Sequence, residues 1–144
     1  MKLQHEFPLE APRIAVPWGI SEVAFVRLLE GSKIERVTAG QLRMRATILG
    51  GLEHPVSFYF EPVANGLLRR IELYRSPQRH KRKGFHDWQA RLERLLGPGE
   101  LAGRTTAAHL EGVTPTRWRL KNLVVTHEYD HLFGRHERVV FRWG

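Results

Sequence analysis

Polar and apolar residues alternate with a period of two through the middle of the chain, which is the pattern of half-buried β-strands. Leucine, methionine, alanine and isoleucine alternate with polar side chains over residues 41–48, and similar alternation recurs at 56–61 and 69–74. Gly50-Gly51 and Asn65-Gly66 separate these runs, and Asn-Gly is a strong hairpin signal. The pattern predicts an antiparallel meander of three strands, preceded by a short strand at 34–38.

Two other segments have the spacing of amphipathic helices, in which apolar residues recur three and four positions apart. Ser21 is a suitable N-cap for the first helix, and Gly31 is suited to its end. The second helix carries Trp88 and Leu92 on its apolar stripe and is predicted to end at Gly97-Pro98. Each helix therefore precedes a group of predicted strands.

The remaining segments complete a helix, meander, helix, hairpin order. Residues 1–19 contain three prolines and are predicted to form an extended lead-in, pinned to the body as an edge strand. Residues 99–116 are predicted to be mainly loop, and Trp118–Tyr129 and Glu137–Trp143 to be two more strands. We expect one α+β domain over residues 1–144, with two helices packed on one face of a mostly antiparallel sheet of about five to six strands. The order also suggests two related helix-plus-sheet units.

Composition limits the cellular setting more than the function. The chain of 144 residues contains no cysteine, which excludes disulfides and thiolate metal sites. No apolar run has the length of a signal peptide or a membrane span. We therefore expect a cytoplasmic protein that does not interact with membranes, and the sequence predicts no cofactor.

The charge balance predicts a basic binding surface. The formal net charge is +8, and most of the basic residues are arginine, which suits recognition of carboxylates and phosphates. Arginine and tyrosine occupy the polar positions of the meander, opposite its apolar positions, and a basic run precedes the second helix. The predicted binding residues are Arg43, Arg45, Tyr59, Arg70, Tyr74, Arg79, Lys81, Arg82 and Lys83. A solvated surface without a partner is the alternative for these charges.

The order of elements from about Trp18 to Trp143 resembles that of small bacterial inhibitor and immunity proteins, which consist of a helix followed by a meander. The position of Trp118 and the apolar-aromatic final strand 139–143 belong to this resemblance. It implies a non-enzymatic protein that neutralises a partner, such as a bacterial toxin, through shape and charge. Because this chain is basic, the expected partner is a protein with an acidic surface.

Nucleic acid is a second candidate ligand for the same surface. Phosphate contacts from basic side chains would supply salt-dependent affinity, and the tyrosines could stack on unpaired bases. The sequence has no RNA-recognition signature and no helix-turn-helix spacing. This alternative therefore depends on whether the basic and aromatic residues share one surface.

A metal-dependent hydrolase is the third candidate, because His127-Glu128-Tyr129-Asp130-His131 matches the zinc-hydrolase pattern. On a helix, His127 and His131 would share a face and could bind one metal ion, with Glu128 as the catalytic carboxylate. On a strand, the two histidines would stand roughly 13 Å apart. The preceding residues 124–126 are all β-branched, so we predict a strand.

The string from His127 to Gly134 also resembles the third signature of peptide deformylases, in which two histidines bind the metal and the glutamate is the general acid-base. A cysteine supplies the third ligand in that family. Here Val113 stands at the corresponding place in residues 111–115, so the ligand set is incomplete. His109 or His136 could supply a replacement ligand.

Overall fold

The computed structural model describes residues 2–61, 66–75, 81–101, 115–130 and 136–144. The described residues form two α-helices, one 3₁₀ helix and ten strands. In chain order the elements are η1 (Lys2–Gln4), β1 (Glu6–Glu10), β2 (Arg13–Pro17), α1 (Glu22–Leu28), β3 (Glu35–Thr38), β4 (Gln41–Ile48), β5 (Leu52–Phe60), β6 (Leu68–Arg75), α2 (Lys81–Leu96), β7 (Glu100–Leu101), β8 (Thr116–Leu120), β9 (Leu123–Asp130) and β10 (His136–Trp143).

Eight of the strands form one antiparallel sheet in the order β3-β4-β5-β6-β10-β9-β8-β7, and β1 and β2 form a separate hairpin. The predicted fold class is therefore confirmed, but the predicted number of strands is wrong. With the lead-in counted as a strand, the segments predicted from the sequence number seven, and the three further strands each depend on a partner distant in sequence or on a short turn. These strands are one arm of the N-terminal hairpin, the two-residue edge strand β7, and β8, which was merged with β9.

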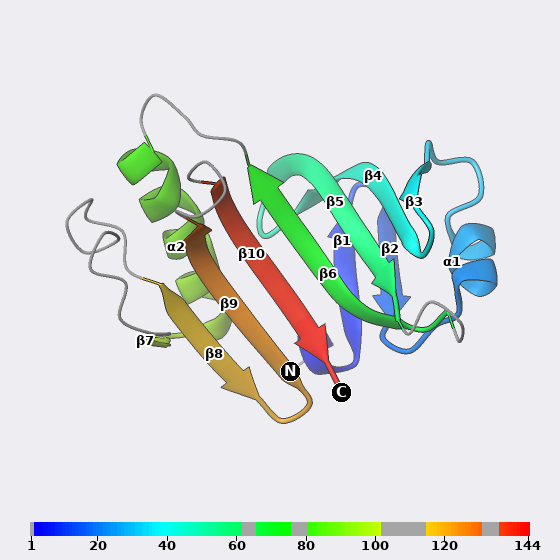
Figure 1. The fold of residues 1–144 in the computed structure, drawn as a ribbon. Coiled ribbons are helices and arrows are strands. Elements are labelled where there is room, and N and C mark those ends of the chain that lie inside the picture. Colours follow the sequence, from blue (N-terminus) through cyan, green and yellow to red (C-terminus); the bar gives the residue numbers. More distant parts are fainter. Residues whose placement is uncertain (1, 62–65, 76–80, 102–114, 131–135) are drawn as a thin grey trace.

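The topology consists of two similar halves. Each helix is followed by four strands, namely β3 to β6 after α1 and β7 to β10 after α2. The last strands of the two halves, β6 and β10, pair antiparallel at the middle of the sheet (Figure 1). The expectation of two related helix-plus-sheet units agrees with this order.

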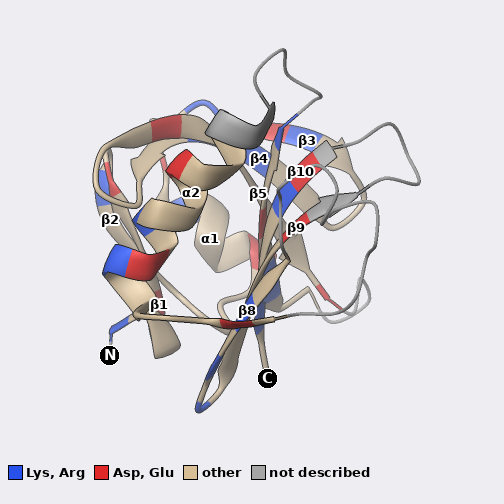
Figure 2. Ribbon diagram, turned by 90° about the vertical axis from the view of Figure 1, so that its left-hand side faces the viewer, with Lys and Arg blue, Asp and Glu red and all other residues tan. Residues whose placement is uncertain are grey.

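Both helices lie on the same face of the eight-stranded sheet, and the β1–β2 hairpin lies between them (Figures 1 and 2). From α1, the Phe25 ring lies 4.6 Å from that of Phe58 in β5. From the hairpin, the Phe7 ring lies 5.1 Å from that of Phe141 in β10. Trp88 of α2 is 1% exposed. The three elements together cover the apolar face of the sheet, which we call the core face.

Three local predictions need correction. The lead-in is not an edge strand of the main sheet, because β1 and β2 pair with each other and pack on the core face. Trp118–Tyr129 is not one strand, because Lys121 and Asn122 form a turn between β8 and β9. The basic run does not wholly precede the second helix, because residues 81–83 begin α2.

The helix ends follow the local signals. The Ser21 side chain accepts a hydrogen bond from the backbone N–H of Ala24 at 3.1 Å, which caps α1 as predicted. α2 ends at Leu96, directly before Gly97, whose φ of +81° suits a glycine. Neither helix, within the described residues, combines the length and apolar character needed to cross a membrane.

Candidate binding surface

The face of the eight-stranded sheet opposite the helices, which we call the outer face, carries most of the predicted binding residues. Strand register places Arg43 beside Ser57, and Ser57 beside Glu72. The neighbouring row runs from Tyr59 to Arg70. These positions alternate along each strand with buried apolar residues of the core face. The arginine and tyrosine side chains therefore lie on the face opposite the apolar one, as the sequence predicted.

Most charges of the outer face are paired across strands. Glu72 is 6% exposed and lies at the centre of the sheet, with its carboxylate 2.8 Å from Arg70 and 3.6 Å from Arg138. Arg138 also donates to Glu128 at 2.9 Å. Further outer ion pairs among the described residues are Arg43–Glu35, Arg45–Glu53, Arg70–Glu61 and Arg119–Glu100. The outer face is therefore a network of opposite charges rather than an uninterrupted basic surface.

Tyr59 contributes to this network and not to an exposed aromatic platform. The Arg70 guanidinium lies 3.9 Å from the centre of the Tyr59 ring, which is the geometry of a cation–π contact. Burial raises the pKa of the Tyr59 hydroxyl, and the Glu72 carboxylate acts in the same direction. One face of this ring is thus already covered by a neighbouring side chain.

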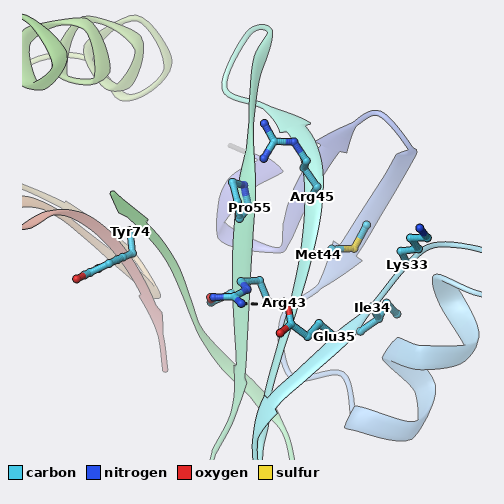
Figure 3. Close-up of a pocket in the computed structure, with 9 residues that line it drawn as sticks. Lys33, Ile34, Glu35, Arg43, Met44, Arg45, Pro55 and Tyr74 are labelled. Carbon is cyan, nitrogen blue, oxygen red and sulfur yellow. Dashed lines mark hydrogen bonds and ion pairs between the residues drawn. The ribbon is translucent and has the colours of Figure 1, made fainter. Parts of the chain in front are cut away.

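A depression of about 700 Å³ occupies the outer face near the β3 edge (Figure 3). Three of its lining side chains are basic, namely Lys33, Arg43 and Arg45. Glu35 is the one acidic residue among them, and it accepts a hydrogen bond from Arg43 at 3.0 Å. Tyr74, which is 49% exposed, lines the depression from β6. We call this set the outer depression.

The structure brings only part of the predicted site together. Arg43, Arg45 and Tyr74 line the outer depression, whereas Tyr59 and Arg70 lie on the same face outside it. Lys81, Arg82 and Lys83 belong to α2, a helix that lies on the core face of the sheet (Figure 1). Arg79 lies outside the described residues. The eight described members of the predicted set are therefore divided between the outer face and α2 on the core face.

Sequence reasoning missed Lys33 and Glu35. They come from the segment between α1 and β4 and reach the site because β3 pairs with β4, with Glu35 opposite Arg43. The available signal was the spacing of opposite charges in the predicted strands at 34–38 and 41–48. Register between strands decides whether such charges meet, and that register was not predicted.

The histidine string lies in β9, so the predicted strand is confirmed for His127–Asp130. His127 is buried on the core face, where its ring stacks on Phe85 at 3.8 Å between ring centres. Glu128 lies on the outer face and binds Arg138. The side chains that a hydrolase would need in one site thus lie on opposite sides of the sheet. His131 and His109 are outside the described residues.

Both ring nitrogens of His127 have protein partners. Nε2 lies 2.6 Å from Glu137 Oε2, and Nδ1 is hydrogen-bonded to the side-chain amide of Gln89 in α2 at 2.7 Å. Arg75 binds the other oxygen of the Glu137 carboxylate. Burial lowers the pKa of His127 below its usual 6.5, although the hydrogen bond to Glu137 acts in the opposite direction. This arrangement joins α2 to β9 and β10.

Comparisons with protein-family models, with curated proteins and with solved structures find no match to this chain. Only the geometry and charge of the described residues therefore point to a function.

Proposed function

We propose that this chain is a non-enzymatic binding protein whose outer depression captures an acidic surface of a protein partner. The observation that carries the proposal is the gathering of Lys33, Arg43, Arg45 and Tyr74 around one concave surface. Arginine and tyrosine are enriched among the residues that dominate protein–protein binding energies. A partner of this kind agrees with the resemblance to inhibitor and immunity proteins, and we include neutralisation of a bacterial toxin in the proposal.

The ion pairs of the outer depression can be exchanged for contacts with a partner. The Arg45 and Glu53 side chains are 62% and 68% exposed, and exposed pairs of this kind contribute about 0–1 kcal/mol each. Partner carboxylates can therefore replace Glu53 and Glu35 at little cost. Lys33 has no ion pair within the part of the chain that the structure describes.

Single-stranded nucleic acid is the second candidate ligand, because Tyr74 lies beside basic side chains in the outer depression. The covered ring of Tyr59 weakens this alternative, since successive bases need several exposed aromatic faces. The protein partner is therefore the better supported candidate.

The test uses the product of the gene adjacent to this one, because immunity proteins are encoded beside their toxins. The immobilised chain should capture that protein, and Arg43→Glu/Arg45→Glu should weaken capture at least about tenfold. The matched control is Arg13→Glu/Arg27→Glu, which makes the same change of net charge at exposed positions in β2 and α1.

An equal loss of capture in the two double variants would show that net charge alone governs capture. That result would refute the outer depression as the binding site. Undiminished capture by Arg43→Glu/Arg45→Glu would refute it as well. Retention of a single-stranded oligonucleotide that weakens with salt and with the same two substitutions would favour the second candidate.

A further inference from the structure

We infer that a second pocket, on the helix side of the sheet, binds a small amphipathic molecule with one anionic group. The pocket has a volume of about 340 Å³ and lies between the N-terminal hairpin, the β4–β5 turn and the last turns of α2. This volume is near the lower end of the range for small-molecule sites, which is roughly 300–1,000 Å³. The outer depression lies on the other side of the sheet, so the inference is independent of the proposed function.

The inner wall of the pocket is apolar and firmly packed. Leu3 and Phe7 line it and are only 2% and 1% exposed, so they belong to the core. Leu49 and Leu95 complete the apolar lining, and Leu95 is 38% exposed on the protein surface. An apolar chain of a ligand would contact Leu95 and remove that side chain from water.

The polar residues of the pocket favour an anion. Arg91, Arg94 and Leu95 lie at positions i, i+3 and i+4 of α2 and therefore share one helix face. Arg94 has no ion pair among the described residues, and its Nε donates a hydrogen bond to the Ala90 carbonyl at 3.4 Å. Arg91 donates through Nη1 to the carbonyls of Leu49 and Gly50, which leaves its other guanidinium nitrogens for a ligand.

The carboxylate of the one acidic residue of the pocket is already hydrogen-bonded to backbone groups. The Glu10 carboxylate accepts hydrogen bonds from the backbone N–H groups of Gly50 and Gly51, at 2.7 and 2.8 Å. Successive N–H groups in left-handed backbone form a concave anion site, and here Glu10 occupies it. The two arginines of the lining therefore outnumber its one carboxylate, whose oxygens already have backbone donors.

The turn that forms one wall is held in a conformation that leucine rarely adopts. Leu49 has a φ of +49°, and Gly50 and Gly51 continue the left-handed backbone with φ of +76° and +103°. Such conformations persist where surrounding contacts enforce them and are often found at ligand sites. Glu10 and Arg91 supply these contacts from two other elements, so the pocket is formed before a ligand binds.

Decanoate is a suitable probe, and its binding can be measured by isothermal titration and by amide shifts in NMR spectra. We expect saturable binding to the intact chain, weakened about tenfold or more when decanoate is replaced by decylammonium. Arg94→Glu and Leu95→Asp should each weaken decanoate binding to a similar extent. The matched control is Val26→Asp, because Val26 in α1 is 43% exposed, close to the value for Leu95, and lies away from the pocket.

Absence of saturable decanoate binding to the folded chain would overturn the inference. Equal binding of decylammonium would overturn the assigned charge of the ligand. Binding that Val26→Asp weakens as much as Leu95→Asp does would indicate non-specific adsorption to exposed apolar side chains, which also overturns it. Thermal unfolding of each variant separates these outcomes from a loss of folding.

Discussion

His127 and Glu137 lie diagonally across β9 and β10, with Nε2 of the imidazole 2.6 Å from Oε2 of the carboxylate. His127 is fully buried and Glu137 is 4% exposed. Arg75 and Gln89 extend this contact to β6 and α2. A buried histidine placed in this way makes stability depend on pH, and the sign of the dependence follows from its pKa.

We predict that the free energy of unfolding falls as the pH is lowered from 7.5 to 5.5. Burial holds the pKa of His127 below 6.5 in the folded chain, so the unfolded chain binds the proton more tightly. Burial also lowers the pKa of His54, which acts in the same direction. Each histidine contributes at most about 1.4 kcal/mol per pH unit. Urea unfolding across this range measures the slope.

His127→Asn should retain only the part of that slope that His54 contributes. If stability instead rises on acidification, His127 gains its proton on folding and attraction to Glu137 outweighs burial. Titration of the His127 ring followed by NMR would then give a pKa above 6.5.

Glu72→Ala should destabilise the chain by about 1–3 kcal/mol, because it removes a buried carboxylate that contacts both Arg70 and Arg138. Glu53→Ala removes an equally charged but 68% exposed side chain and should change the unfolding free energy by less than about 1 kcal/mol. Chemical denaturation of both variants gives the comparison. Equal effects of the two substitutions would contradict the assigned role of Glu72.

Phe25→Ala should cost about 3–5 kcal/mol, because the fully buried ring packs on Phe58 and Phe60 and its removal leaves a cavity under α1. Its neighbour Val26 is 43% exposed, and Val26→Ala should stay within about 0.5 kcal/mol of the parent. Thermal unfolding distinguishes them. A small effect of Phe25→Ala would mean that α1 contributes little to the core.

Gly99→Ala should destabilise by about 1–3 kcal/mol, although its φ is not left-handed. A Cβ at this position would lie 2.4 Å from Thr116 Cγ2 and 2.8 Å from Trp118 Cε2, both in β8. The same substitution should cost less in a Thr116→Ser background, which lacks the closest atom. A double-mutant cycle measures this coupling, and additive effects would show that the predicted clash is relieved elsewhere.

Local patterns were sufficient for the strands of the meander, for the start of α1 and for the end of α2. Alternation defined β4, β5 and β6, and Ser21 and Gly97 marked helix boundaries. The sequence does contain a local signal for the turn between β8 and β9. Apolar residues occupy alternate positions up to Leu120, but the next is Leu123, so the phase of the alternation changes across Lys121 and Asn122.

Other features depend on contacts between distant segments. The N-terminal hairpin could not be placed on the core face from its own sequence, since its packing on Phe141 depends on the rest of the fold. Lys33 and Glu35 join the outer depression only through the register of β3 with β4. The strand conformation of His127 was predictable, but its partners Glu137 and Gln89 were not.

The pairing of β6 with β10 leaves only the two shortest strands of the sheet at its margins, β3 with four residues and β7 with two. A chain ending after β6 would instead expose the eight-residue ladder of that strand, an effective template for aggregation. Because the two halves pair edge to edge through β6 and β10, the long central strands cannot pair with strands of other chains.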